Sequence, residues 1–292
     1  MTSVAVQDPS PVGDPGTTPG AARKRRVRST GSLGGPSTLG LGVALTWFSI
    51  LVLIPLSAVI ITASGGGWSE FWSIVTSTQT ASAIRLTVTQ AAVVTLLNVV
   101  MGTALAWVLV RDRFWGKRAL DVVIDVPFAL PTIVAGLVLL SLYGPQSPLG
   151  VNVASTRWAV FLALAFVTLP FVVRTTQPVL EALERDAEEA AASLGAGRLT
   201  IFRRVILPAL TPAIAAGAAL SFARGISEYG SLVLLSGNLP NRTEVASVRV
   251  VAYLENGNQA AAASVAAILL VVALVVIVGL DLIQRRVARR GA

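Results

Sequence analysis

Six apolar stretches alternate with polar segments along the chain. They cover about residues 39–63, 86–110, 121–143, 158–178, 206–235 and 261–283. Each stretch is near or above the ~20 residues that an α-helix needs to cross a hydrocarbon layer of ~30 Å. The first is too long for the apolar region of a signal peptide, so we expect it to remain in the protein. The pattern predicts an all-α integral membrane protein with six transmembrane helices.

The segments outside these stretches have a different composition. Residues 1–38 are rich in Gly, Pro, Ser and Thr and contain five basic residues between Arg23 and Arg28. Such a segment cannot bury enough apolar surface to fold, so we predict a disordered basic tail. Residues 39–285 form the membrane domain, and residues 286–292 form a second basic tail. The aromatic residues in 68–82 predict a helix at the outer membrane interface.

Charge decides the orientation. The chain is 13% charged, against roughly one quarter in a soluble domain, and its net charge is +8. One set of alternate loops, with both tails, holds 18 Lys and Arg residues, and the other set holds four. Because basic loops stay in the cytoplasm, we predict that both termini are cytoplasmic. The positive charge is then explained by topology, and we expect no binding of nucleic acid.

Composition also excludes most catalytic chemistry. The chain has no cysteine and no histidine, so it has no thiol nucleophile, imidazole base or ordinary zinc site. Its lysines are Lys24 and Lys117, and neither lies in a phosphate-binding loop. An intramembrane hydrolase would need a nucleophile with a base, and an ion-coupled carrier would show inverted repeats and more spans. We therefore expect that this chain is not an enzyme. Any ATP that drives its function must be hydrolysed by another polypeptide.

The segment 181–205, between the fourth and fifth stretches, is long, mixed in charge and helical in pattern. Ala187, Ala190, Ala191 and Leu194 recur at helical spacing, with acidic residues on the remaining surface. Gly195 ends the pattern. A helix this polar and rich in alanine suits a groove on a partner. A solvated connector helix is the simpler interpretation of the pattern alone.

The same segment resembles a known motif. Glu189-Ala190-Ala191, then Gly195, then Leu207-Pro208 resemble the EAA loop of ABC-importer permeases, with Val205 where that pattern has isoleucine. In that family the loop forms the coupling helix, which sits in a cleft of the ATPase subunit. The resemblance implies that the ATPase-coupling residues here are Glu188, Glu189, Ala190, Ala191, Leu194, Gly195, Leu207 and Pro208.

Further segments look like the sulfate/thiosulfate (T-subunit type) and molybdate permeases. They are residues 125–132, 143–150, 171–180 and 221–230. The resemblance implies the type I ABC-importer permease fold in the bacterial inner membrane. It also implies a second homologous permease, two copies of an ATPase that holds ATP and Mg, and an extracytoplasmic sulfate-binding protein. This chain would bind no cofactor, and a molybdate or tungstate importer is the alternative.

The ionisable residues within the apolar stretches include Asp125, Arg224 and Glu228. Each costs ~2.5–3.5 kcal/mol at the centre of a bilayer, so we expect all three to face protein or water. Arg224 and Glu228 are four residues apart and can form an internal ion pair. A second interpretation places these charges along the translocation pathway. Asp125 precedes Pro127 and Pro131, which predict a kink, and is expected to satisfy freed backbone groups or a basic neighbour.

Overall fold

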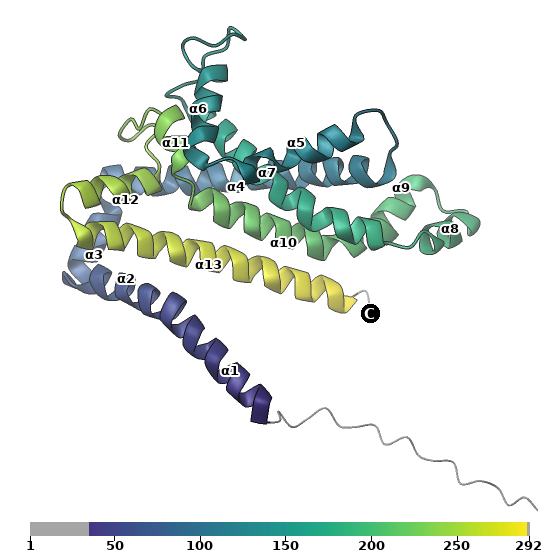
Figure 1. Ribbon diagram of the computed structural model, residues 1–292, viewed down its shortest axis with the longest axis horizontal. Helices are drawn as coiled ribbons and strands as arrows, with labels where there is room; N and C mark the ends of the chain where they lie inside the picture. The colour runs from purple at the N-terminus through teal and green to yellow at the C-terminus, as the bar shows by residue number, and fades with distance from the viewer. Residues whose placement is uncertain (1–34, 291–292) are drawn as a thin grey trace, which may run out of the picture. The chain divides into compact units, whose positions relative to one another are not determined.

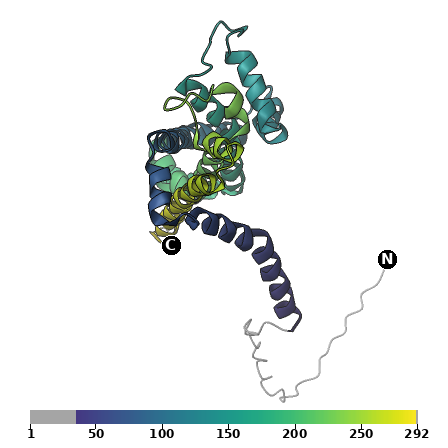
Figure 2. The ribbon, with the colours of Figure 1, turned by 90° about the vertical axis from the view of Figure 1, so that its left-hand side faces the viewer.

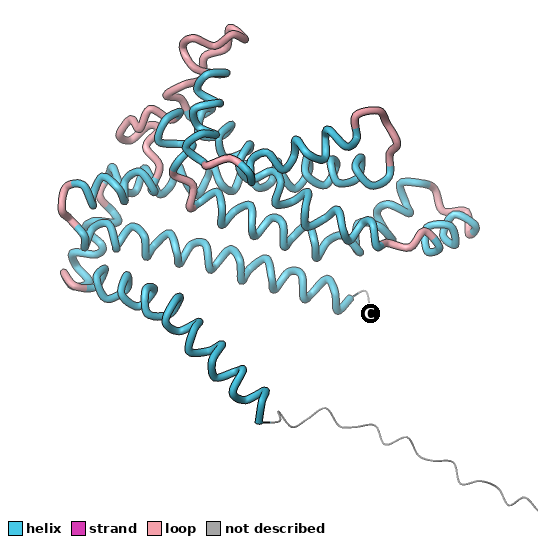
Figure 3. The backbone as a smooth tube through the Cα atoms, in the orientation of Figure 1, coloured by secondary structure: helices cyan, strands magenta, loops and turns pink. Residues whose placement is uncertain are grey.

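A computed structural model describes residues 35–290, and every regular element in this range is a helix (Figures 1 and 3). The chain divides between Ile50 and Leu51 into two compact units. Residues 1–34 of the predicted basic tail, and residues 291–292 at the other end, lie outside the described range.

The first unit contributes α1 (Gly35–Phe48), whose apolar side chains Leu39, Val43 and Trp47 are exposed. A π-helical turn (Ser49–Leu53) follows, and α2 (Ile54–Ser64) belongs to the second unit. The apolar stretch predicted at 39–63 corresponds to helical residues Leu39–Ser64. Exposed apolar helix surface of this kind suits a lipid environment.

The second unit is built around four long helices. They are α4 (Thr78–Arg111), α7 (Arg157–Ala182), α10 (Leu207–Ile226) and α13 (Gln259–Arg290). The helix α7 packs against both α4 and α10, and α13 packs against α10 and α2. Figure 2 views these helices nearly along their axes. They supply most of the buried core and hold the candidate site residues in place.

Close approach between these helices depends on small residues. A Cβ at Gly217 of α10 would lie 2.8 Å from the Cα of Val172 in α7, and a Cβ at Gly102 of α4 would lie 2.9 Å from the Cβ of Val172. Both distances are shorter than real side chains allow. Small residues at such crossings let membrane helices pack backbone to backbone.

The helix predicted at the membrane interface and the second span meet without a loop. The structure has α3 (Gly67–Thr76) and then α4 from Thr78, separated only by Ser77. A helix was predicted over 68–82, but residues 78–85 extend the second span instead. Two further short helices are α11 (Gly230–Leu235) and α12 (Ala246–Glu255).

The third predicted span, 121–143, is not one straight helix. It is divided into α5 (Lys117–Ala129) and α6 (Thr132–Tyr143), which meet at a bend of 116°. Pro131 lacks an N–H, and Leu130 before it is extended (φ −88°, ψ 134°), as the residue before a proline prefers. The predicted kink is therefore a sharp break. The described residues contain five continuous candidate spans, and six if this bent pair crosses as one.

The fifth predicted span, 206–235, is wrong at both ends. The helix begins with α9 (Arg198–Ile201) and a π-helical turn (Phe202–Ile206), continues as α10, and stops at Ile226. Pro208 has no N–H with which to donate the helical hydrogen bond to the carbonyl four residues earlier. The wider π-helical turn lies directly before it. The downstream residues fold into α11, where Gly230 lies so close to α6 that a Cβ would be 2.8 Å from the Ile133 nitrogen.

Candidate functional site

The predicted coupling segment contains the short helix α8 (Asp186–Ser193) (Figure 1). Acidic residues occupy its first turn, where the helix dipole favours negative charge. Gly195 ends it in the left-handed conformation (φ 82°). The N–H of Gly195 donates to the carbonyl of Ala192 at 2.9 Å, and that of Ala196 donates to Ala191 at 3.0 Å. These two bonds form a Schellman motif, which requires positive φ at Gly195.

The surface of α8 is open. None of its residues is buried, and Leu194 just beyond it is 89% exposed. Glu189 and Ala190 are exposed, whereas Glu188 and Ala191 are partly covered.

The structure gathers the predicted coupling residues into two places. Residues 188–195 lie on α8 and its C-terminal turn, whereas Leu207 and Pro208 lie at the start of α10. The π-helical turn and α9 connect the two places and pack against α8. The helix α8 is therefore in contact with the segment that leads into α10.

Sequence reasoning missed the contact that ties α8 to the membrane helices. Arg111, at the end of α4, donates a hydrogen bond to the carboxylate of Glu188. Its guanidinium also lies 5.7 Å from the ring centroid of Trp107, and Phe202 packs edge-on against that ring at 5.7 Å. These residues line a groove of about 900 Å³ between α4, α8 and α9. In the sequence Arg111 is one basic residue among several, and nothing local marks its partner.

The predicted ion pair in the fifth span is confirmed. Arg224 Nη2 lies 2.8 Å from Glu228 Oε2. Glu228 is in the break between α10 and α11, and its Oε1 accepts hydrogen bonds from the N–H and the hydroxyl of Ser231, both at 2.9 Å. The side chain of Glu228 is fully buried, whereas that of Arg224 is 31% exposed. The carboxylate therefore fixes the start of α11 while the guanidinium keeps access to its surroundings.

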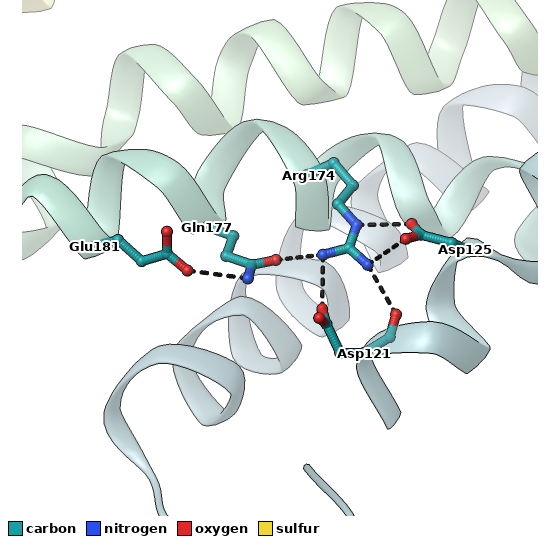
Figure 4. A network of polar contacts seen from close by, with 5 residues as sticks. All are labelled: Asp121, Asp125, Arg174, Gln177 and Glu181. Atoms are coloured by element: carbon teal, nitrogen blue, oxygen red, sulfur yellow. Dashed lines mark hydrogen bonds and ion pairs between the residues drawn. The ribbon is translucent and has the colours of Figure 1, made fainter. Parts of the chain in front are cut away.

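Asp125 belongs to a different network, centred on Arg174 of α7 (Figure 4). Arg174 donates from Nε and Nη2 to the two carboxylate oxygens of Asp125, both at 2.7 Å. It also donates from Nη1 to Asp121 at 2.7 Å and to Gln177 at 2.6 Å, and Gln177 donates to Glu181 at 3.0 Å. This forked pairing joins α5 to α7. Asp121 and Asp125 are four residues apart and therefore lie on the same face of α5. This spacing is the sequence signal that could have predicted a basic partner shared by both carboxylates.

A third polar cluster holds α12 against α4. The hydroxyl of Tyr253 lies 2.9 Å from that of Thr80, and the Arg249 guanidinium lies 4.2 Å from the centroid of the tyrosine ring. Burial alone would raise the pKa of Tyr253, but the hydrogen bond with Thr80 and the interaction with the Arg249 charge outweigh it and lower the pKa below its ordinary value. Glu244 accepts a hydrogen bond from Gln79 at 2.7 Å and lies 3.9 Å from Arg249.

Comparison with known proteins gives one consistent result. Residues 98–290 match the family described as binding-protein-dependent transport system inner membrane component. The sulfate transport system permease protein CysT of Salmonella typhimurium is 41% identical over 260 residues, which cover 87% of this chain and 94% of that protein. The CysT protein of Escherichia coli is 39% identical over 260 residues, with the same coverage of both chains.

The fold has solved counterparts. A chain of a bacterial alginate ABC transporter, in complex with an alginate-bound periplasmic protein, matches with a TM-score of 0.69 over 86% of this chain and 94% of its own length. At 18% identity this likeness shows the fold alone. The family match covers more than half of the chain, and the first relatives are matched over nearly their whole length. This chain belongs to the family of binding-protein-dependent transport system inner membrane components, and is a multi-pass, non-catalytic permease subunit of an ABC transport system.

Proposed function

We propose that this chain is the permease subunit of an ATP-driven importer for sulfate and thiosulfate. The observation that carries the proposal is the 41% identity to a sulfate permease, over 94% of that relative's length. The molybdate or tungstate alternative is not favoured, because the relatives that match over most of the chain are named as sulfate permeases.

The proposed topology has six spans, with α5 and α6 counted as one broken span, and both termini in the cytoplasm. The distribution of Lys and Arg, 18 against four, supports this orientation. Within the second unit, α8 and α9 lie at one end of the long helices, and α3 and α12 lie at the other (Figure 1). Arg111 is at the α8 end, and Arg249 is in α12. The first end would face the cytoplasm and the second the outside.

In the proposed complex, α8 is the coupling helix and docks in a cleft of the ATPase. Two ATPase copies would hold ATP and Mg, this chain would bind no cofactor, and a second homologous permease would complete the pathway. An extracytoplasmic binding protein would deliver sulfate. Support comes from the open surface of α8 and from its contact with Arg111, through which an ATPase movement would reach α4.

Arg111→Gln tests this transmission. The two side chains of the Arg111–Glu188 pair are 12% and 21% exposed, so the pair is only weakly screened. A hydrogen bond to a charged group is worth ~1.5 kcal/mol or more, and we expect sulfate transported per ATP hydrolysed to fall about tenfold. Arg113→Gln, which removes an exposed charge from the same turn, is the control and should retain normal coupling. An equal ratio of sulfate transported to ATP hydrolysed in the two variants would show that Arg111 does not transmit the movement.

The intramembrane charges are assigned two roles. We propose that Arg224 borders the translocation pathway, where a forked donor attracts a divalent oxyanion and its buried partner Glu228 keeps that binding weak. Asp125 would act beside the pathway by holding α5 against α7 through Arg174.

The cargo is tested in cells that lack this chain. Uptake of radiolabelled sulfate should be lost in these cells and restored by the intact gene, and excess thiosulfate should compete more strongly than molybdate. Molybdate competition equal to that of unlabelled sulfate, with no effect of thiosulfate, would show that the cargo is wrong while leaving the ABC permease assignment intact.

A further inference from the structure

A polar pocket of about 520 Å³ lies at the α3 and α12 end of the second unit, apart from the coupling helix. One wall is the first three turns of α4, a second is the start of α7, and a third is the loop after α11. Its polar lining residues, which we call the outer arginine pocket, are Thr78, Ser82, Arg85, Thr89, Arg157 and Asn241.

The pocket carries positive charge without a matching negative charge. Neither Arg85 nor Arg157 has a carboxylate within 4.0 Å among residues 35–290, and no acidic side chain lines the pocket. The arginines nearer the middle and the other end of the long helices, Arg111, Arg174 and Arg224, are paired with acids, whereas Arg203 and Arg204 in the turn before α10 resemble Arg85 and Arg157 in having no acidic partner within 4.0 Å among residues 35–290. The two guanidiniums are therefore available to an anion from outside the chain.

The acidic residue closest in sequence to Asn241 is Glu244, and its carboxylate already has partners within the chain. Glu244 is buried, accepts a hydrogen bond from Gln79, and lies 3.9 Å from Arg249. The Nε of Arg157 is directed to the carbonyl of Arg242 at 3.4 Å, which holds the start of α7 beside the loop that carries Asn241. The positive charge of the pocket is thus a fixed feature of the folded chain.

The polar lining is not suited to lipid. Thr78, Ser82, Arg85 and Thr89 follow one another on one face of α4, at spacings of three and four residues. A stripe of hydroxyls around an arginine would be unfavourable against acyl chains. The hydroxyl of Thr89 donates to the carbonyls of Arg85 and Leu86. The hydroxyls of Thr78 and Ser82, the Asn241 amide and the two forked guanidiniums are the kinds of donor that bind an oxyanion.

We propose that the outer arginine pocket is a weak capture site for a tetrahedral divalent oxyanion, sulfate in the first place, after its release from the binding protein and before translocation. This inference rests on the proposed cargo and orientation. A pocket of 520 Å³ has room for the ion with part of its hydration shell, so binding is weak and release is fast. The uncompensated charge would raise the local concentration of the anion at the entrance.

The absence of cysteine from the chain allows a direct test. Ser82→Cys places one thiol in the lining, and the assembled complex is treated from outside with an anionic or a cationic methanethiosulfonate reagent. We expect the anionic reagent to react about tenfold faster, because the pocket attracts it. Sulfate should slow that reaction more than chloride at equal ionic strength. Ser73→Cys, on the exposed surface of α3 and outside the pocket, should show neither effect.

Variants and conditions separate the possible occupants. Arg85→Gln with Arg157→Gln should abolish both the preference for the anionic reagent and the protection by sulfate. Equal protection by chloride, or protection by the sulfate-free binding protein alone, would overturn the proposal in favour of screening or protein docking. Protection seen only with anionic lipid, and not with added sulfate, would assign the pocket to a lipid phosphate and also overturn it.

The readout is independent of transport. Normal sulfate uptake with no sulfate protection at Ser82→Cys would count against the pocket alone. Sulfate protection in a complex that does not import sulfate would count against the proposed function alone.

Discussion

Gly195→Asp is expected to reduce sulfate uptake about a hundredfold while leaving the chain in the membrane at its normal level. Gly195 has φ 82°, and nothing lies within 4 Å of a Cβ built there, so the substitution meets backbone strain but no collision. That strain is ~1–2 kcal/mol, and it loosens the Schellman turn that ends α8. The new carboxylate would also stand in the proposed contact with the ATPase, where central residues contribute ~2 kcal/mol or more.

Gly257→Asp is the matched control for this variant. Gly257 also has positive φ, 74°, with nothing within 4 Å of its Cβ, but it follows α12 at the opposite end of the second unit. The measurements are the amount of each variant in the membrane and the sulfate taken up per ATP hydrolysed. Similar losses of uptake in both variants would mean that backbone strain, and not the position of Gly195 beside α8, causes the defect.

Gly217→Leu is expected to prevent folding. A Cβ at Gly217 would lie 2.8 Å from the Cα of Val172 and 3.2 Å from the carbonyl oxygen of Phe171, and backbone atoms of α7 cannot move aside as a side chain can. Overpacking of a core typically costs ~1–3 kcal/mol, and this crossing should reach or exceed the upper figure. We expect at least a tenfold loss of monodisperse protein extracted in mild detergent.

Gly279→Leu is the corresponding control, because Gly279 of α13 has nothing within 4 Å of its Cβ. It should be extracted in normal amount. Equal yields of the two leucine variants would show that the approach of α10 to α7 at Gly217 is not needed for folding.

The hydropathy of the sequence predicted the long helices. The places where the prediction was wrong are bends and breaks that depend on packing between helices. Continuous apolar runs located the long helices, but a run such as 121–143 has the same hydropathy whether it is straight or bent. Pro131 indicated a kink, and only packing determines that the bend reaches 116°. Likewise, residues 227–235 are apolar enough to extend the fifth span. They turn away because Gly230 fits against α6 and Glu228 bonds to Ser231.

In the candidate site, too, features within one segment were predicted and contacts between distant segments were not. Local patterns predicted the helix α8, its end at Gly195 and the pairing of Arg224 with Glu228, since these features involve neighbours along one segment. The contacts of Arg111 with Glu188 and of Arg174 with Asp125 join residues far apart in sequence. A single sequence contains no signal for such pairs beyond the presence of charges that need partners.

Sulfate accumulation in proteoliposomes that contain this chain with its partner permease and ATPase distinguishes an ATP-driven importer from a carrier. Accumulation should require ATP inside the vesicles and the loaded binding protein outside, and Gly195→Asp should reduce it about a hundredfold. Accumulation by the permeases alone, driven by an ion gradient and unaffected by removal of the ATPase, would contradict the proposed ATP-driven import.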